Sequence, residues 1–71
     1  MADIKFEMII GCHSVFIKMR QDQCFQLAVN AFKERQRLEH LECYLDDELL
    51  DTRLTIQQLE LKEGDKMYCI S

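Results

Sequence analysis

Cysteine and histidine are the residue types in this sequence best suited to bind a metal. Cys12 stands beside His13, and Cys43 follows His40 by three residues, so a zinc site of two cysteines and two histidines can be written. Zinc ligands usually come as close pairs from tight loops, whereas Cys43 falls in a predicted strand. We therefore expect the cysteines to be small, buried hydrophobic residues, and we predict no metal site.

The cysteines also give no sign of a disulfide framework. They stand at Cys12, Cys24, Cys43 and Cys69, with no C-x-x-C pair. The N-terminal residues M-A-D-I-K-F lack the basic and apolar segments of a secretory signal. Disulfides are therefore not expected, and we predict an intracellular location, in the nucleus or the cytoplasm.

The sequence does not predict catalysis. A cysteine–histidine pair needs a pocket and a third, orienting group, and a chain of 71 residues has little room for one. No glycine-rich phosphate loop is present. The carboxylates of Asp46, Asp47 and Glu48 could ligate a metal ion, but a solvated turn is the favoured interpretation. We expect neither an enzyme nor a cofactor.

Length and composition favour one small folded domain over residues 1–71. Hydrophobic residues make up 48% of the chain and charged residues 31%, a balance typical of a folded protein. The net charge is −4, whereas nucleic-acid binders usually carry a basic excess. No apolar run approaches the ~20 residues of a membrane span. We therefore predict no nucleic-acid or membrane partner, and a monomer as an isolated domain.

Hydrophobic periodicity predicts the elements that must position these residues. Alternating apolar residues predict strands at 4–10, 15–19, 41–45 and 66–70, and a very short strand at 49–50. Gly11 starts a turn over residues 11–14, which would join the first two strands as a hairpin.

A helix is predicted over residues 23–38, with Asp22 as its N-cap. Its apolar side chains cover a wide arc, which indicates either a deeply seated helix, the favoured interpretation, or an arc with half-exposed rims. The spacing of Ile56 and Leu59 predicts one helical or 3₁₀ turn within residues 52–59. The order β-β-α-β-β-(short helix)-β, with the first strand pairing the last, predicts an α+β fold. It is the β-grasp, a mixed sheet packed on one main helix.

Three segments resemble the ubiquitin and small ubiquitin-like modifier (SUMO) superfamily, and the SUMO branch fits better than ubiquitin itself. They are A-F-K-E-R-Q at 31–36, L-E-C-Y-L-D-D-E-L-L at 41–50, and L-x-L-K-E-G-D-K-M-Y-C-I at 59–70. The resemblance implies the ubiquitin-like β-grasp. This sequence departs from the family at Asp47, where a glycine is usual in the turn. Because aspartate tolerates unusual backbone angles, we expect the turn to be kept.

Family members that are conjugated to lysine carry a Gly-Gly tail after the last strand, and this sequence ends at Ser71. The resemblance therefore implies a non-conjugated SUMO-like domain, such as those within larger genome-maintenance proteins. Such a domain would be an adaptor that docks SUMO- or ubiquitin-pathway proteins without a covalent bond. Two alternatives stay open: a true modifier whose tail lies beyond this sequence, and a ubiquitin-like adaptor for another receptor.

The resemblance implies three surfaces for protein partners. The acidic end, which in SUMO proteins contacts the conjugating enzyme, consists of Asp46, Asp47, Glu63 and Asp65. The edge-strand groove, which in SUMO proteins takes a hydrophobic peptide flanked by acids, consists of Ile17, Lys18, Met19, Arg20, Ala28 and Arg35. The sheet face, the main apolar patch of ubiquitin, consists of Tyr44, Tyr68 and Ile70, with Ile9 beside them.

Each surface also has a purely structural interpretation. Acidic turns are usually just solvated, and isolated apolar residues on a surface need no partner. Ile17 and Met19 could be core residues, with the stem of Arg35 lying along the helix end. The sequence leaves these alternatives open.

Overall fold

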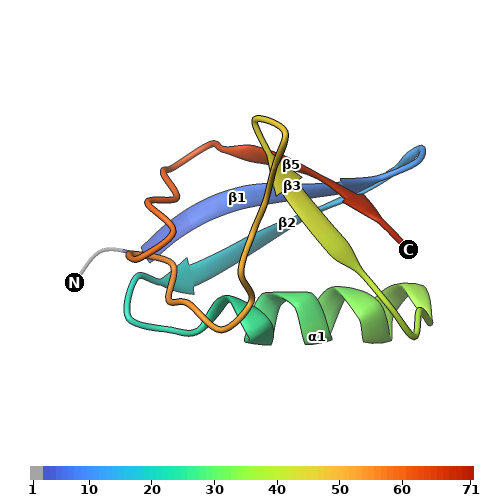
Figure 1. Cartoon of the computed structure of the whole chain (residues 1–71), viewed down its shortest axis with the longest axis horizontal. Coiled ribbons are helices and arrows are strands. Elements are labelled where there is room, and N and C mark those ends of the chain that lie inside the picture. The colour runs from blue at the N-terminus through green and yellow to red at the C-terminus, as the bar shows by residue number, and fades with distance from the viewer. Residues whose placement is uncertain (1–2) are drawn as a thin grey trace.

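The computed structural model describes residues 3–71, which fold into five strands and one helix (Figure 1). The elements are β1 (Asp3–Ile10), β2 (His13–Arg20), α1 (Phe25–Gln36), β3 (Glu42–Leu45), β4 (Glu48–Leu49) and β5 (Lys66–Ile70). Within this part of the chain, no helix combines the length and apolar character needed to span a membrane.

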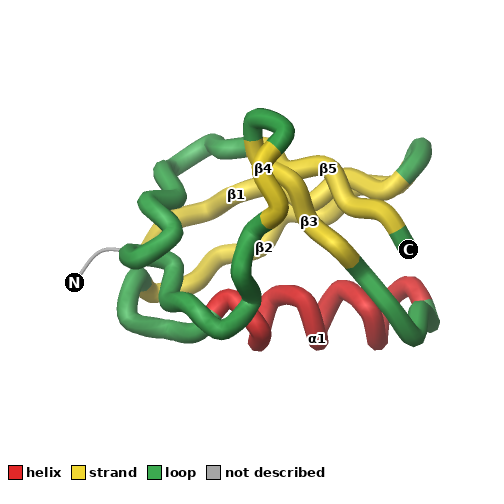
Figure 2. The backbone as a smooth tube through the Cα atoms, viewed as in Figure 1, coloured by secondary structure: helices red, strands yellow, loops and turns green. Residues whose placement is uncertain are grey.

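The strands form one mixed sheet in the order β2-β1-β5-β3-β4. β1 and β5 run parallel at its centre, with Met8 opposite Met67, which confirms the predicted pairing of the first and last strands. The remaining neighbours are antiparallel. Figure 2 shows α1 lying along one face of this sheet, which leaves the other face without a helix.

The core lies between the sheet and α1, where apolar side chains of β1, β2, β3 and β5 meet one helix face. Phe6, Met8, Ile56 and Met67 are completely buried, and the rings of Phe6 and Phe25 lie 6.2 Å apart between centroids. Within α1 the buried residues are Phe25, Ala28, Val29 and Phe32. Two members of the predicted apolar arc, Leu27 and Ala31, are exposed at its rim.

The start of α1 differs from the prediction. The N-cap is Cys24, in extended conformation and without a side-chain capping bond, so the assignment of Asp22 as N-cap was wrong. Cys24 makes a bridge with Thr55, and the N–H of Phe25 donates to the carbonyl of Leu54 at 2.9 Å. This pairing holds the chain extended up to Cys24, and the carboxylate of Asp22 instead contacts Arg20 Nε at 3.2 Å.

The end of α1 and the first hairpin are both tighter than predicted. Arg37 takes a left-handed conformation, φ 57°, and the N–H of Leu38 donates to the carbonyl of Lys33, which ends the helix at Gln36. Gly11 has φ 57°, as expected of a turn glycine. His13 already pairs with Ile10, so residues 13–14 belong to β2 rather than to the turn.

The segment between β4 and β5 winds around one end of the sheet, beside the start of α1 (Figure 2). Residues 56–60 are hydrogen-bonded turns, in agreement with the single helical or 3₁₀ turn predicted within residues 52–59. The N–H of Leu59 donates to the carbonyl of Thr55 at 3.0 Å, the spacing of one α-helical turn, and the N–H of Gln57 donates to the carbonyl of Gln21 at 3.0 Å. The bond to Gln21 ties this segment to the chain just before α1. The side chain of Ile56 is completely buried.

Candidate protein-interaction surfaces

The turn between β3 and β4 sets the position of two carboxylates. Leu45 pairs with Glu48, so Asp46 and Asp47 form a two-residue hairpin loop. Both have positive φ, 51° and 66°, which is the conformation that a tight hairpin requires at both central positions. Aspartate tolerates this region better than most residues do. The predicted survival of the turn without glycine at Asp47 is confirmed, and both carboxylates are exposed.

The outer face of the sheet carries a row of large side chains across four strands. Leu49 lies opposite Tyr44, Tyr44 opposite Tyr68, and Tyr68 opposite Ile9. Directly opposed residues in a sheet point to the same face. Tyr68 and Leu49 are 62% and 58% exposed, and Ile70, two residues along β5 from Tyr68, is 57% exposed. The predicted sheet-face residues therefore lie together.

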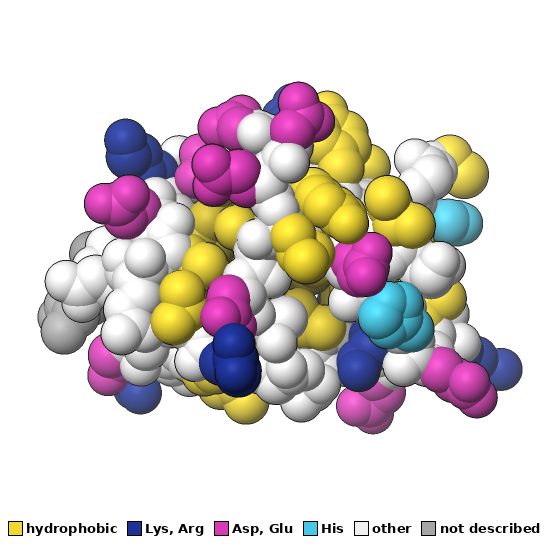
Figure 3. All heavy atoms as spheres, viewed as in Figure 1, with side chains coloured by type: hydrophobic (Ala, Val, Ile, Leu, Met, Phe, Trp, Pro, Cys, Tyr) yellow, Lys and Arg dark blue, Asp and Glu magenta, His cyan; other side chains and the backbone are white. Residues whose placement is uncertain are grey.

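Two of the predicted surfaces share one hollow. Its volume is about 590 Å³, and its lining residues are Tyr44, Asp46, Asp47, Lys66, Tyr68 and Ile70. Figure 3 shows acidic side chains gathered over the β3–β4 turn, with hydrophobic side chains beside them. We call these six residues the β3–β5 surface. The sequence suggested its tyrosines and its aspartates as separate sites, because strand pairing, not chain order, brings them together.

A hydrogen bond to Glu42 orients Tyr44. Its hydroxyl donates to Glu42 Oε1 at 3.1 Å, and the other oxygen of Glu42 lies 3.4 Å from His40 Nε2. The hydrogen bond to the Glu42 carboxylate raises the pKa of Tyr44 above its usual range. The ring of Tyr44 is thereby tied to its own strand beside the hollow. Glu42 was not predicted as a site residue, although its position two before Tyr44 places it on the same face.

Glu63 and Asp65 do not line this hollow. Glu63 Oε1 accepts a hydrogen bond from the N–H of Lys5 at 2.8 Å, and Asp65 Oδ2 accepts one from the N–H of Lys62 at 2.9 Å. Both carboxylates therefore hold the turn that leads into β5. Asp65 immediately precedes Lys66, so it stays near the edge of the β3–β5 surface.

The predicted edge-strand groove is present between β2 and α1. Its volume is about 210 Å³, and it is lined by Ile17, Lys18, Met19, Gln23, Leu27, Ala28 and Ala31. Arg20 and Arg35 lie outside it, and Arg20 is paired with Asp22. Met19 is only 6% exposed, whereas Leu27 is 54% exposed. Leu27 belongs to the wide apolar arc that was predicted for the helix, but it was not among the predicted groove residues.

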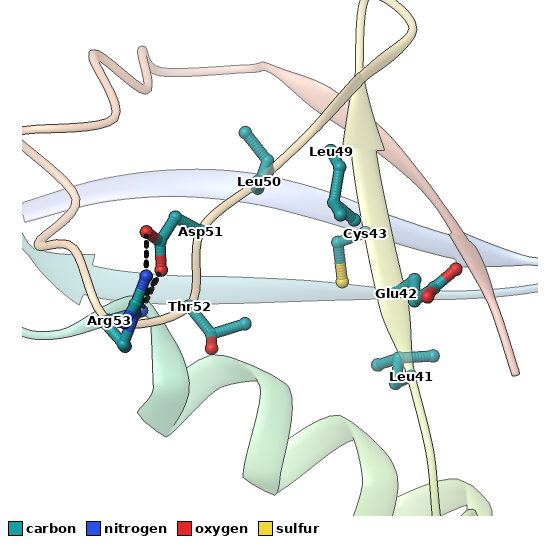
Figure 4. Close-up of a pocket in the computed structure, with 8 residues that line it drawn as sticks. All are labelled: Leu41, Glu42, Cys43, Leu49, Leu50, Asp51, Thr52 and Arg53. Carbon is teal, nitrogen blue, oxygen red and sulfur yellow. Dashed lines mark hydrogen bonds and ion pairs between the residues drawn. The ribbon is translucent and has the colours of Figure 1, made fainter.

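A third hollow, which the sequence did not predict, lies between β3 and the segment after β4 (Figure 4). Its volume is about 410 Å³, and it is lined by Leu41, Glu42, Cys43 and residues 49–53. At its rim Asp51 accepts hydrogen bonds from the backbone N–H and the guanidinium of Arg53. The guanidinium of Arg53 is the main reason that the pKa of Asp51 lies below its usual range.

The cysteines do not assemble the zinc set that the sequence allows on paper. Within residues 3–71, no three His, Cys, Asp or Glu side chains are grouped as metal ligands. Cys12 is exposed in the first hairpin, whereas Cys43 is buried. Cys43 lies opposite Cys69, and their Sγ atoms are 3.3 Å apart.

Comparison with known proteins places this geometry in a recognised fold. No family model matches the sequence, and no curated protein does. Among solved structures, Caldiarchaeum subterraneum ubiquitin is similar, with a TM-score of 0.88 and 13% identity over 99% of this chain and 94% of that one. A structure described as molecular mimicry of SUMO that promotes DNA repair has a TM-score of 0.86 and 13% identity, over 100% of this chain and 94% of that one.

A plant structure is also similar. The ubiquitin-like domain of an Arabidopsis thaliana protein has a TM-score of 0.85 and 7% identity, over 99% of this chain and 78% of that one. The chain therefore has the ubiquitin-like β-grasp fold shared by ubiquitin and SUMO-like proteins, as its sequence motifs implied.

Proposed function

We propose that this ubiquitin-like domain is a non-covalent adaptor that docks a partner protein on the β3–β5 surface. The partner is a component of the SUMO or ubiquitin pathway, and the conjugating enzyme is the first candidate. Such a partner implies work inside the cell, in the nucleus or the cytoplasm. The observation that carries the proposal is the hollow in which Tyr44, Tyr68 and Ile70 meet the carboxylates of Asp46 and Asp47.

The composition of this surface is that of an interface. Tyrosine is enriched in protein interfaces, whose cores are depleted of charged residues and whose rims are polar and solvent-accessible. Here Tyr68 and Ile70 are more than half exposed at the centre of the patch, while Asp46 and Asp47 stand at one end. A tyrosine whose hydroxyl is already bound to Glu42 loses less conformational freedom when a partner covers it.

The groove between β2 and α1 supports a second candidate, the binding of an extended hydrophobic peptide. β2 is an edge strand of the sheet, so one side of its backbone is free to pair with an added strand. Leu27, 54% exposed beside Ile17, supplies apolar surface for alternate side chains of that peptide. Lys18 lines the same groove and favours acidic residues flanking the peptide.

Two matched substitutions separate the candidates in an NMR titration of the ¹⁵N-labelled domain with the conjugating enzyme. Tyr68→Ser and Leu27→Ser each replace an exposed hydrophobic residue, one on the β3–β5 surface and one in the groove. Docking on the β3–β5 surface predicts that Tyr68→Ser weakens binding about tenfold or more, as at an interface hot spot, while Leu27→Ser has little effect.

The opposite pattern, obtained with a hydrophobic peptide flanked by acids, would support the groove. If ubiquitin-receptor peptides shift the β3–β5 resonances and the conjugating enzyme does not, the domain is an adaptor for another receptor. The proposal fails if no β3–β5 resonance moves with either partner in large excess.

A further inference from the structure

Cys43 and Cys69 form a dithiol in the core that the proposed docking function does not use. They are direct partners across β3 and β5, with Sγ atoms 3.3 Å apart. Their exposed fractions are 1% and 6%. Both side chains point to the inner face of the sheet, whereas their chain neighbours Tyr44 and Tyr68 point to the outer face.

The backbone places this pair where a cross-strand disulfide fits. The N–H of Leu50 donates to the carbonyl of Cys43 at 2.8 Å, so the backbone groups of Cys43 point toward β4 and away from β5. Cys43 and Cys69 are therefore a non-hydrogen-bonded pair, whose Cα atoms typically lie about 4.5 Å apart. Disulfides join Cα atoms about 4.4 to 6.8 Å apart, so the strands need little movement to accept one.

Cys43 also lines the third hollow. Figure 4 shows its side chain among the lining residues, between β3 and the segment after β4. In the sheet order, β5 lies on one side of β3 and β4 on the other. Cys43 thus has the hollow on its β4 side and the sulfur of Cys69 on its β5 side.

We propose that Cys43 and Cys69 are a site of reversible oxidation, which forms an intramolecular disulfide by exchange with a low-molecular-weight disulfide such as oxidised glutathione. The thiolate of Cys43 attacks one sulfur of the reagent, forming a mixed disulfide and releasing one reagent thiolate. The thiolate of Cys69 then attacks the sulfur of Cys43, and the second reagent thiolate leaves. The protein loses two protons and two electrons, and the reagent disulfide is reduced to two thiols.

The exchange is expected to be slow in the folded protein at neutral pH. The hydrogen bond with Cys69, and then burial, raise the pKa of the Cys43 thiol above its ordinary value. Because only the thiolate is nucleophilic, the rate should rise with pH and with a denaturant concentration that loosens the sheet without unfolding it. The product would fasten β3 to β5 directly beneath Tyr44 and Tyr68.

The test treats the folded natural chain with oxidised glutathione at mildly alkaline pH. The chain is then unfolded, free thiols are blocked with N-ethylmaleimide, and trypsin fragments are analysed by mass spectrometry without reduction. Cleavage after Arg37, Arg53 and Lys66 leaves Cys43 in peptide 38–53 and Cys69 in peptide 67–71, each with a single cysteine. We expect these two peptides to be joined, in a monomer lighter by two hydrogen atoms, and to separate on reduction.

Controls distinguish this site from general thiol oxidation. Cys12→Ser removes an exposed thiol and should leave the joined peptides unchanged, whereas Cys43→Ala and Cys69→Ala should each abolish them. Recovery of peptides 38–53 and 67–71 with N-ethylmaleimide or glutathione on each would overturn the proposal. So would a link that appears only between two molecules. If one alanine variant does not fold, the peptide analysis of the natural chain still decides the question.

Discussion

Tyr44 and Tyr68 lie directly opposite each other across β3 and β5, on the face of the sheet that α1 does not cover. Cross-strand aromatic pairs contribute roughly 0.2–1 kcal/mol to stability relative to alanine. A double-mutant cycle of Tyr44→Ala and Tyr68→Ala, followed by urea denaturation, should give a coupling energy in that range. The same cycle with Phe16, exposed on the distant strand β2, in place of Tyr44 should give no coupling. Equal coupling in both cycles would contradict the pairing.

The strained turn of β3 and β4 makes Asp47→Gly a stabilising substitution. Asp47 has φ 66°, a region that costs most L-residues roughly 1–2 kcal/mol and costs glycine almost nothing. Glycine also raises the entropy of the unfolded chain, so we expect a net gain of about 0.5–1 kcal/mol in the free energy of unfolding. Glu48→Gly, within β4, is the matched control and should destabilise by a similar amount. A loss of stability in Asp47→Gly would refute the strain argument.

Much of the fold was predictable because burial repeats with the period of each element. Phe6 and Met8 in β1, and Met67 and Cys69 in β5, are buried as their alternation indicated. The ends of α1 were not predictable in this way. Asp22 has the chemistry of an N-cap, but the bonds that decide the helix start come from Leu54 and Thr55, about thirty residues away.

The candidate sites depend on long-range structure even more than the ends of α1 do, because strand register and loop paths form them. Tyr44 and Tyr68 were each predicted on the outer face, yet the register that joins them with Asp46 and Asp47 is a tertiary property. Arg20 and Arg35 were predicted in the groove from the family resemblance, but both lie outside its lining. The third hollow is formed by the path of residues 49–53, and hydrophobic periodicity does not predict the path of a connecting segment.

The irregular segment between β4 and β5 contributes to the core through Ile56. Its side chain is completely buried, although it stands in a turn and not in a helix or strand. Ile56→Ala should therefore lower the free energy of unfolding by about 2–5 kcal/mol, the usual cost of removing a buried aliphatic side chain. Leu49→Ala, at an exposed position, should change it by less than about 0.5 kcal/mol. If urea denaturation shows an equally small effect for both substitutions, the segment between β4 and β5 packs loosely around Ile56.

The titration of Tyr44 tests its bond to Glu42. The bond raises the pKa of Tyr44, so its contribution to folding is fully present below the ordinary pKa of tyrosine and disappears as pH rises through the raised value. In a Tyr68→Phe background only Tyr44 gives a phenolate absorbance. Glu42→Ala should then lower the observed pKa of Tyr44. An unchanged titration curve would show that the hydroxyl is not bound to Glu42 in solution.

The oxidised chain should be more stable than the reduced one, because the disulfide lowers the conformational entropy of the unfolded chain. Cys43 and Cys69 are 26 residues apart. The loop-entropy relation gives a gain of up to about 3.5 kcal/mol for a loop of this length, less any strain in the folded state. Denaturation of the purified disulfide form, with and without reductant, measures the difference directly.

Cys43→Ala provides the control for that comparison, because it should respond to neither oxidant nor reductant. A gain close to the loop-entropy value would show that β3 and β5 accept the link without distortion, as their non-hydrogen-bonded pairing at Cys43 and Cys69 leads us to expect. An oxidised form less stable than the reduced form would mean that the sheet must distort to bring the two sulfurs together. The disulfide would then be a strained and readily reduced link instead of a brace beneath the β3–β5 surface.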